Sequence, residues 1–243
     1  MAEPLRLLDT IKQTVELVWE NRIGLGKVVA AAGLVNGIFA WLLIENIEST
    51  AFMWVYFLGG GLVYTLLAVN VHRLVLNASN KPVLHRWAWR ETRFLGWLAV
   101  IYFYVYLIFL IPLVLIASPV KYFDGDYDWL WNAATLPGGY LFARLSLLLP
   151  ATALDQRQNM AWAWGLTDKN GWRLLVLLWV LPMLIASAAP AAVSDSSSPI
   201  VFLIWHAVIA AGTALEIALL SVVFKTLGGL TEAPPEAPAQ VSS

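Results

Sequence analysis

The sequence contains no cysteine among its 243 residues, and only 13% of them are charged. The lack of cysteine excludes disulfide scaffolds, thiolate zinc sites, iron–sulfur clusters and cysteine nucleophiles. Soluble domains carry about 25% charged residues, so this chain has too little charge to cover a soluble surface. The formal net charge of −1 gives no overall attraction to nucleic acid, which we exclude as a partner.

Apolar and aromatic side chains are in excess: 60% of the residues are hydrophobic, 13 are Trp, and the mean hydropathy is +0.70. Lipid offers no partners to backbone N–H and C=O groups, so spanning segments of this kind must be helices of about 20 apolar residues. We therefore predict an all-α polytopic membrane protein with one membrane domain, residues 1–230. Its six transmembrane helices are Ile23–Ile44, Ala51–Val71, Phe94–Ala117, Trp129–Ala153, Trp172–Val193 and Ile200–Phe224.

The Lys and Arg residues predict how the spans are oriented. Of the 15, 13 fall on one side of the predicted spans, whereas the opposite loops hold only Lys121. Because short cytoplasmic loops are enriched in Lys and Arg, both termini are expected in the cytoplasm. Residues 5–20 place apolar side chains at helical spacing, which predicts an interfacial helix on the inner leaflet. The Pro- and Ala-rich segment 231–243 is predicted to be a disordered cytoplasmic tail.

Two segments of the sequence repeat one pattern. Residues 87–97 read WAWRETRFLGW and residues 162–172 read WAWGLTDKNGW, with six identical positions that include three Trp pairs. Trp19 precedes Gly26 by seven residues, as Trp89 precedes Gly96 and Trp164 precedes Gly171. We interpret this as three parallel repeats, residues 1–76, 77–153 and 154–230, each with a cytoplasmic interfacial helix, a turn at glycine and a helical hairpin. The alternative is that Trp recurs only because membrane interfaces favour it.

A family pattern is found in residues 141–175, within LFARLSLLLPATALDQRQNMAWAWGLTDKNGWRLL. The residues that carry it are Arg144-Leu145-Ser146-Leu147, Pro150-Ala151, Ala163-Trp164, Leu166-Thr167, Asn170 and Trp172-Arg173-Leu174. This segment resembles a bacterial family found as the membrane domain of glycerophosphoryl diester phosphodiesterases and as stand-alone six-span proteins of unknown function. The resemblance implies a fold and a location in the bacterial cytoplasmic (inner) membrane, and it implies no catalytic residues.

Two ionisable residues lie well inside predicted spans, Arg144 and Glu216. They lie nine and eight residues before the cytoplasmic ends of their spans, so at about 1.5 Å per residue their depths are nearly equal. A lone charge at the bilayer centre costs about 2.5–3.5 kcal/mol on insertion scales. We therefore predict that they pair, or share a polar network with Asn70, either as a neutralised structural pair or as a proton or ion relay.

Cofactor and metal sites are not indicated. His72 and His206 lie near opposite ends of their predicted spans, so they cannot hold one haem iron between them. His206 alone could be a ligand, although a lone intramembrane His more often hydrogen-bonds a neighbouring helix. No His–Glu cluster has metal-ligand spacing, and Ser146 lacks the surroundings of a serine nucleophile. We predict no enzyme and no cofactor.

Cationic and indole side chains gather at the predicted inner interface. They can contact anionic lipid or a partner protein, although the bias of cytoplasmic loops toward Lys and Arg would also place the cations there. The candidate contact residues are Trp19, Arg73, Arg86, Trp87, Trp89, Arg90, Arg93, Trp97, Trp162, Trp164, Trp172 and Arg173.

For function, the first hypothesis is a non-catalytic scaffold or accessory subunit that binds the lipid bilayer and another membrane protein or complex. It fits the short loops and the lack of a catalytic constellation. The alternative is a transporter or lipid-handling protein with a polar cavity between repeats, around Arg144, Asn70 and Glu216. A polar cavity in the structure would favour the second hypothesis, and a dry bundle with a flat apolar face the first.

Overall fold

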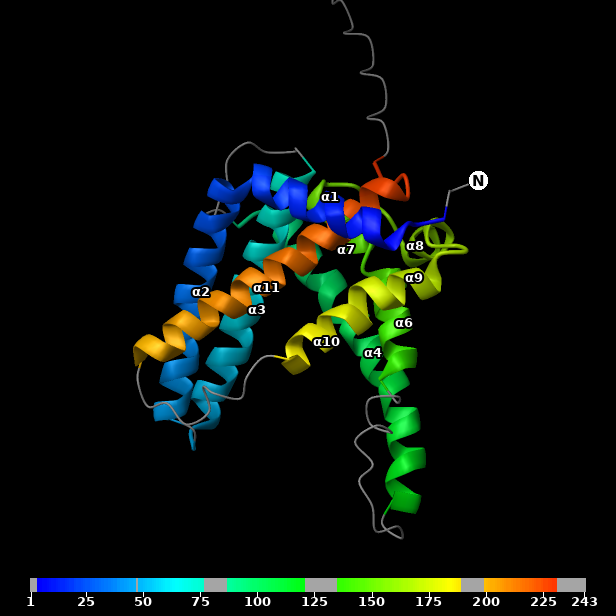
Figure 1. Cartoon of the computed structure of the whole chain (residues 1–243). Coiled ribbons are helices and arrows are strands. Elements are labelled where there is room, and N and C mark those ends of the chain that lie inside the picture. Colours follow the sequence, from blue (N-terminus) through cyan, green and yellow to red (C-terminus); the bar gives the residue numbers. More distant parts are fainter. Residues whose placement is uncertain (1–3, 47, 77–86, 121–134, 189–198, 231–243) are drawn as a thin grey trace, which may run out of the picture.

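The computed structural model describes residues 4–46, 48–76, 87–120, 135–188 and 199–230, and every regular element in these ranges is a helix (Figure 1). The predicted all-α class is therefore confirmed. The predicted tail, residues 231–243, lies outside the described residues. In chain order the helices are α1 (Leu7–Glu20), α2 (Arg22–Glu45), α3 (Thr50–Val75), α4 (Trp89–Val120), α6 (Leu136–Leu145), α7 (Leu148–Ala153), α8 (Met160–Leu166), α9 (Gly171–Leu175), the π-helix η1 (Val176–Val180), α10 (Leu181–Ala188) and α11 (Pro199–Thr226).

Four of these helices are long and apolar enough to cross a membrane. They are α2, α3, the part of α4 over Trp89–Ile111 and the part of α11 over Leu203–Thr226. These four correspond to the first, second, third and sixth predicted spans. The fourth and fifth predicted spans contain shorter helices instead, α6–α7 and α9–η1–α10. The chain is thus a helical protein with four candidate membrane-spanning helices.

The helix that covers the fourth predicted span breaks between Leu145 and Leu148. Pro150 has no N–H to donate to the carbonyl of Ser146, and that carbonyl accepts instead from Leu149 N–H at 2.9 Å, one residue earlier. A second irregularity precedes Pro182 in the fifth predicted span, where residues 176–180 form a π-turn and Leu181 N–H reaches back to the carbonyl of Val176. Both irregular turns follow from a proline inside an apolar helix.

The first and last long helices pack closely against each other, and α11 crosses α2 in Figure 1. Gly33 and Gly37 of α2 form the contact, since a Cβ built on Gly33 would meet the Cα of Ala207 at 2.7 Å and one on Gly37 would meet a methyl of Leu203 at 2.9 Å. Two small residues four apart allow helix backbones to approach in membranes. Contacts continue from α2 to α3, α3 to α4, α4 to α6, α6 to η1 and η1 to α11, so these helices form a ring.

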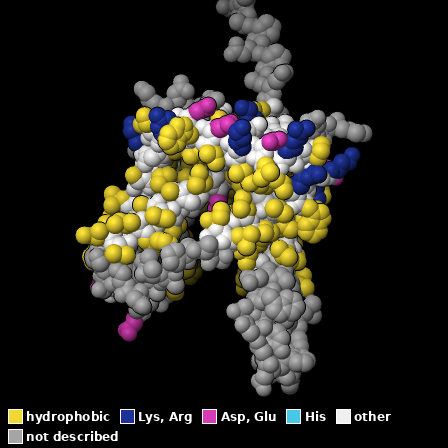
Figure 2. Space-filling model, in the orientation of Figure 1, with side chains coloured by type: hydrophobic (Ala, Val, Ile, Leu, Met, Phe, Trp, Pro, Cys, Tyr) yellow, Lys and Arg dark blue, Asp and Glu magenta, His cyan; other side chains and the backbone are white. Residues whose placement is uncertain are grey.

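Helix α1 lies across one end of this ring (Figure 1). It packs on α11. Its buried residues are Thr10 and Thr14, whose hydroxyl groups donate to carbonyls of the preceding turn at 2.9 and 2.8 Å. Its opposite side exposes Leu8, Val15 and Trp19. An amphipathic helix with an exposed apolar row suits a position along a membrane surface. Figure 2 shows Lys and Arg side chains at this same end, above a hydrophobic band.

The two indole-rich segments differ in conformation. Residues 89–97 belong to the uninterrupted helix α4, so Gly96 lies inside a helix where a turn was expected. In the other segment α8 ends at Leu166, a turn follows with Lys169 in the left-handed region (φ 63°), and α9 begins at Gly171. The turn between α1 and α2 lies at Asn21, before Gly26. The matched residues therefore do not impose one local fold, because the turn is placed by neighbouring residues that differ between the copies.

Candidate functional site: a polar pocket between broken helices

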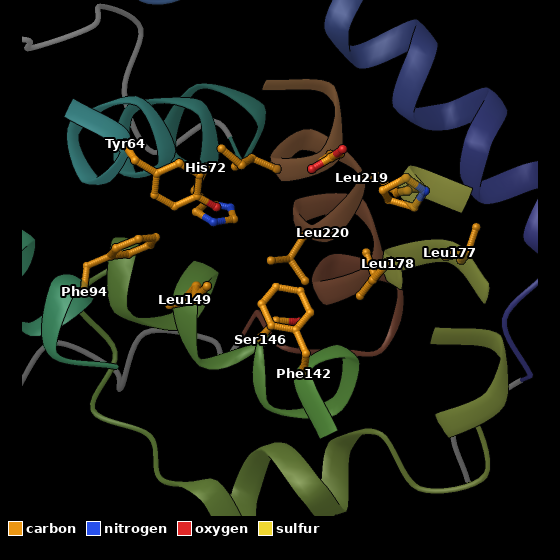
Figure 3. A pocket seen from close by; sticks show the side chains of 13 residues that line it. Tyr64, His72, Phe94, Phe142, Ser146, Leu149, Leu177, Leu178, Leu219 and Leu220 are labelled. Carbon is orange, nitrogen blue, oxygen red and sulfur yellow. The ribbon is translucent and has the colours of Figure 1, made fainter. Parts of the chain in front are cut away.

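A small cavity of about 50 Å³ lies inside the ring of helices (Figure 3). It receives side chains from α3, α4, α6, α7, η1, α10 and α11, and most of them are apolar. Four polar side chains interrupt this apolar lining, those of Tyr64, His72, Ser146 and Glu216. A cavity of this volume is large enough for a few water molecules or a small polar group.

His72 is almost completely buried, with 1% of its surface exposed. Its Nδ1 lies 2.7 Å from the hydroxyl oxygen of Ser221, and that hydroxyl lies 2.9 Å from the carbonyl of Ile217. The carbonyl can only accept, so the single proton of Ser221 is directed to it and Nδ1 donates to Oγ. In the neutral ring Nε2 then carries the lone pair. This buried Nε2 has no hydrogen-bond partner in the described part of the chain.

Ser146 lies in the break between α6 and α7, and Pro182 follows the π-turn; both line the same cavity. Ser146 is fully buried, and its hydroxyl donates to the carbonyl of Ala143 at 3.2 Å. At membrane depth, irregular backbone is tolerated where it is enclosed by protein or lines a cavity. The two proline-dependent irregularities therefore meet at the polar pocket, and π-turns are frequent at functional sites.

Glu216 is the acidic residue of the pocket, on α11 beside Ile217. Its side chain is exposed, so it forms a part of the lining that neighbouring helices do not enclose. No ion pair within 4.0 Å joins it to a Lys, Arg or His among residues 4–46, 48–76, 87–120, 135–188 and 199–230. Because a charge within the bilayer is costly, an intramembrane carboxyl without a protein cation indicates a functional site.

A second, larger cavity of about 860 Å³ lies next to the first, between α2, α3, α4 and α11. Tyr64 lines both cavities and therefore stands where they meet. The polar lining of the larger cavity includes Asn36, Tyr102, His206 and Thr213, among more numerous apolar and aromatic groups. Its volume lies within the range of about 300–1,000 Å³ that is typical of small-molecule sites.

The predicted pair of Arg144 and Glu216 is not formed. Arg144 is buried, and its guanidinium donates to Thr167 Oγ1 at 2.8 Å and to the carbonyl of Trp164 at 2.6 Å. A third, longer bond of 3.3 Å reaches the hydroxyl of Tyr140. Equal depth along two helices did not determine the partner, because the break at Ser146 and the packing of α8 against α6 bring hydrogen-bond acceptors to Arg144.

Asn70 does not line either cavity. It is buried on α3, and its side-chain amide donates to the carbonyl of Leu66 at 2.8 Å, one turn earlier in the same helix. Of the three residues in the predicted polar network, Glu216 therefore lines the pocket, whereas Arg144 and Asn70 are bonded elsewhere. His206 lines the larger cavity and His72 the smaller one.

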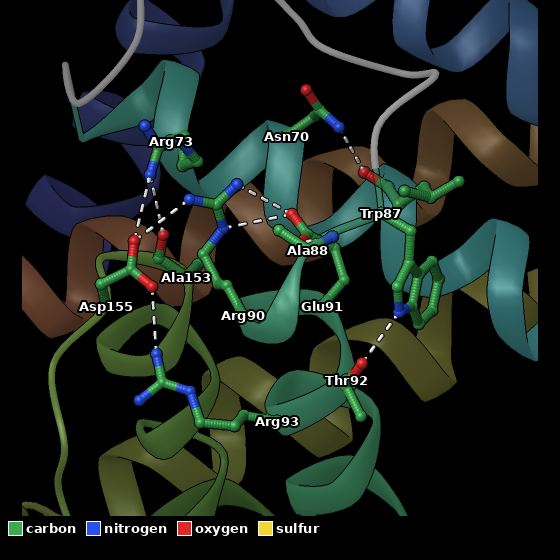
Figure 4. A network of polar contacts seen from close by, with 11 residues as sticks. Asn70, Arg73, Trp87, Ala88, Arg90, Glu91, Thr92, Arg93, Ala153 and Asp155 are labelled. Atoms are coloured by element: carbon green, nitrogen blue, oxygen red, sulfur yellow. Dashed lines mark hydrogen bonds and ion pairs between the residues drawn. The ribbon is translucent and has the colours of Figure 1, made fainter.

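Three of the predicted interfacial arginines converge on one carboxylate (Figure 4). Arg90 and Arg93 donate to Asp155 at 3.1 and 3.0 Å, and Arg73 lies 3.9 Å from it. Arg90 also donates to the buried carboxylate of Glu91 at 2.8 Å, which in turn accepts from the backbone N–H of Ala88 at 2.8 Å. This cluster, which we call the Asp155 cluster, joins the end of α3, the start of α4 and the end of α7.

The predicted interfacial tryptophans fall into two groups. The exposed ones are Trp19, Trp87, Trp89, Trp164 and Trp172. Trp97 and Trp162 are partly buried instead and pack against the core, with Trp162 6.2 Å from the ring of Phe224. Arg173 is exposed on α9, and Arg86 lies outside the described residues. The exposed group is placed to contact lipid or a partner, whereas the packed pair stabilises the bundle.

No group of three or more His, Asp or Glu side chains that could hold a metal ion is present in the ranges that the structure describes. The residues that sequence reasoning did not connect are His72, Ser146 and Tyr64, which come from α3 and from the distant break between α6 and α7. One signal was present: Pro150 follows Ser146 by four residues, the spacing that leaves the Ser146 carbonyl without its helical donor. The position of His72 opposite this break depends on tertiary packing.

No family model, no curated protein and no solved structure matches this chain. The resemblance of residues 141–175 to the membrane domain of the phosphodiesterases therefore stays a prediction. The arguments about function that follow depend on the geometry of the two cavities and on the charge distribution.

Proposed function

We propose that this chain is a transport or lipid-handling protein that takes an amphipathic molecule into the two cavities that meet at Tyr64. The observation that supports it is the polar pocket itself. Among the described residues, the buried Nε2 of His72 has no hydrogen-bond partner, and the more exposed carboxyl of Glu216, on the same mostly apolar lining, has no protein cation within 4.0 Å. Buried polar groups without partners are unfavourable, and they are found where a ligand or water completes their bonding.

The same proposal includes the arrangement in the membrane. The segments α6–α7 and α9–η1–α10 each span 18 residues, 136–153 and 171–188, which at about 1.5 Å per residue gives roughly 27 Å. This is close to the hydrocarbon thickness of about 30 Å, so both are proposed to cross the membrane as broken helices and to complete six spans in three parallel repeats. Helices interrupted at a binding site are a common feature of transporters.

The proposed location is a bacterial inner membrane with both termini in the cytoplasm. It is supported by the Lys and Arg side chains at the α1 end of the molecule, and by Glu45 at the opposite end of α2 with Glu48 just after it. A role as a scaffold or accessory subunit that binds another membrane protein stays a prediction. The exposed tryptophans support that role only weakly, because the membrane interface alone accounts for them.

The absence of cysteine makes the cavities directly testable. We would introduce Thr213→Cys in the larger cavity, Ser146→Cys in the smaller one and Thr152→Cys as the control, since Thr152 is buried and lines neither cavity. A small membrane-permeant methanethiosulfonate reagent should modify Thr213→Cys fastest and Ser146→Cys more slowly, and Thr152→Cys should not react before unfolding. If neither cavity position reacts faster than the control, the proposed function is wrong.

The orientation is tested with the same approach. In right-side-out vesicles a membrane-impermeant thiol reagent should label Glu48→Cys, whereas Lys12→Cys and Lys169→Cys should react only after permeabilisation. Glu48 and Lys169 lie between helices and Lys12 lies on α1, so all three positions are outside the candidate spans. Labelling of Lys12→Cys in intact vesicles would contradict the proposed orientation.

A further inference from the structure

The smaller pocket offers hydrogen-bond acceptors and almost no donors. Nε2 of His72 presents a lone pair, as derived above from its bond to Ser221. The hydroxyl proton of Ser146 is directed to Ala143, so its oxygen also presents lone pairs to the pocket. The carboxyl group of Glu216 adds further acceptor oxygens and is the only carboxyl among the described residues of this lining. Of the four polar groups, only the hydroxyl of Tyr64 has a proton that no described bond uses.

The charge balance of the pocket is equally one-sided. No Lys or Arg is found among the described residues that line it. Arg73 and Arg93 directly adjoin the lining residues His72 and Phe94 in the sequence, but both pair with Asp155. The guanidinium of Arg144 is held by Thr167 and Trp164 and is not part of the lining either. An ionised carboxylate of Glu216 would therefore depend on a cation from outside the chain, because a lone charge in hydrocarbon is costly.

A primary ammonium group fits both properties. We propose that the pocket binds the primary ammonium group of an amphipathic amine; this inference rests on the proposed function and names its substrate class. The ammonium group supplies the positive charge for Glu216 and carries three N–H donors, enough for His72 Nε2 and Ser146 Oγ. A water molecule could donate a hydrogen bond to His72 Nε2 but could not neutralise the carboxylate of Glu216. A quaternary ammonium group would supply the charge but has no N–H for the histidine.

The aromatic side chains of the lining support a cation as the occupant. Tyr64, Phe94 and Phe142 line the pocket beside the acceptors, and the rings of His72 and Phe94 lie 5.9 Å apart (Figure 3). The faces of aromatic rings attract cations electrostatically. An anionic head such as a phosphate would meet a carboxyl and lone pairs here, with no Lys or Arg among the described lining residues to bind it. The smaller pocket therefore discriminates by charge as well as by hydrogen bonding.

Such a ligand would occupy both cavities, with its head in the smaller one and its chain in the larger one. About 50 Å³ accommodates an ammonium group with one or two methylenes, and not a complete lipid. The apolar remainder would extend past Tyr64 into the larger cavity of about 860 Å³, whose lining is mostly apolar and aromatic. Tyr64 would then contact the ligand at the point where its charged head joins its apolar chain.

The test compares three amphiphiles of equal chain length on the intact protein in phosphatidylcholine nanodiscs. We expect saturable binding of dodecylamine, about tenfold or more weaker binding of dodecyltrimethylammonium, and none of dodecyl phosphate, after subtraction of empty discs. Glu216→Gln should weaken dodecylamine binding about tenfold or more, whereas Glu45→Gln, at the end of α2 and outside both cavities, should not change it.

A second measurement observes His72 directly in the parent protein, and a variant serves only to assign its signal. The chain has three histidines, so a sample labelled with ¹⁵N-histidine gives a simple spectrum. The Nε2 signal of His72, assigned by its loss in His72→Gln, should shift from a free to a hydrogen-bonded acceptor when dodecylamine binds. A shift in discs that contain phosphatidylethanolamine, with no amine added, would identify the lipid headgroup as the source. A shift only on addition of amine would identify a free amine.

The outcomes separate this inference from the proposed function. Equal binding of the trimethylammonium compound, tighter binding of dodecyl phosphate, or an unchanged His72 signal on saturation would overturn the assignment of a primary amine. If Thr213→Cys still reacts in the thiol experiment, the cavity and the proposed function stand. If no amphiphile binds saturably and Thr213→Cys is unreactive as well, both proposals are wrong.

Discussion

The guanidinium carbon of Arg144 lies 3.6 Å from the centre of the Trp164 ring, so the arginine stacks on the indole while it bonds the backbone carbonyl of the same residue at 2.6 Å. This contact joins α6 to α8, two elements that the break at Ser146 would otherwise leave loosely connected. The stacked arginine is buried and has neutral partners, and its charge is distributed over a ring face and three oxygen acceptors. The Arg144 contact therefore holds the wall of the polar pocket in place.

Arg144→Lys tests this contact. Lysine keeps the charge but cannot stack as a plane or donate in a fixed fork, so the carbonyl of Trp164 or the hydroxyl of Thr167 loses its donor. We expect a loss of about 1–3 kcal/mol in stability, seen as a lower midpoint of thermal unfolding in detergent. Arg173→Lys, on the exposed side of α9, is the matched control and should stay within about 0.5 kcal/mol of the parent protein. Equal losses in both variants would contradict the assigned role.

Asp155→Asn tests the Asp155 cluster. Asp155 has φ 63°, a left-handed conformation that Asn also tolerates, so the substitution removes charge without new backbone strain. Arg73, Arg90 and Arg93 would then repel one another at the junction of α3, α4 and α7. Because Asp155 is half exposed, we expect a loss of only about 1 kcal/mol.

Salt dependence separates this electrostatic effect from a loss of packing. The difference between Asp155→Asn and the parent protein should shrink in about 1 M salt, where the Debye length falls to roughly 3 Å. Asp168→Asn, on the exposed turn after α8, should unfold at the parent midpoint in both low and high salt. A difference for Asp155→Asn that does not change with salt would show that charge is not its cause.

Gly33→Ala tests the crossing of α2 and α11. The added methyl would meet backbone atoms of Ala207, which cannot move away without shifting the whole helix. We expect a loss of about 1–3 kcal/mol, measured by thermal unfolding. Gly212→Ala is the control on α11, since nothing lies within 4 Å of its added Cβ. That control should be neutral or up to about 1 kcal/mol more stable, because Gly is unfavourable inside a helix. A tolerated Gly33→Ala would show that this close packing is not required.

The sequence was sufficient for features that depend on the solvent around a segment. The long apolar runs of α2, α3 and α11 had to be helices, because hydrocarbon leaves a backbone no other partners. The amphipathic spacing of α1 likewise predicted its position across one end of the bundle, and the uneven distribution of Lys and Arg predicted a basic end. Periodicity and composition carry this information locally, so neighbours in space are not needed to read it.

The partners of individual polar groups were not predictable in the same way. Depth along a helix suggested Glu216 for Arg144, but depth leaves open the direction in which each side chain points around its helix. Proline-dependent breaks before Pro150 and Pro182 rotate the following turns, which brings Trp164 to Arg144 and Ser146 to the pocket opposite His72. The sequence by itself determined which segments are helical and apolar, because that depends on composition and period. Only the tertiary structure decided which polar atoms meet, because rotation and crossing of helices are set by the packing of all of them together.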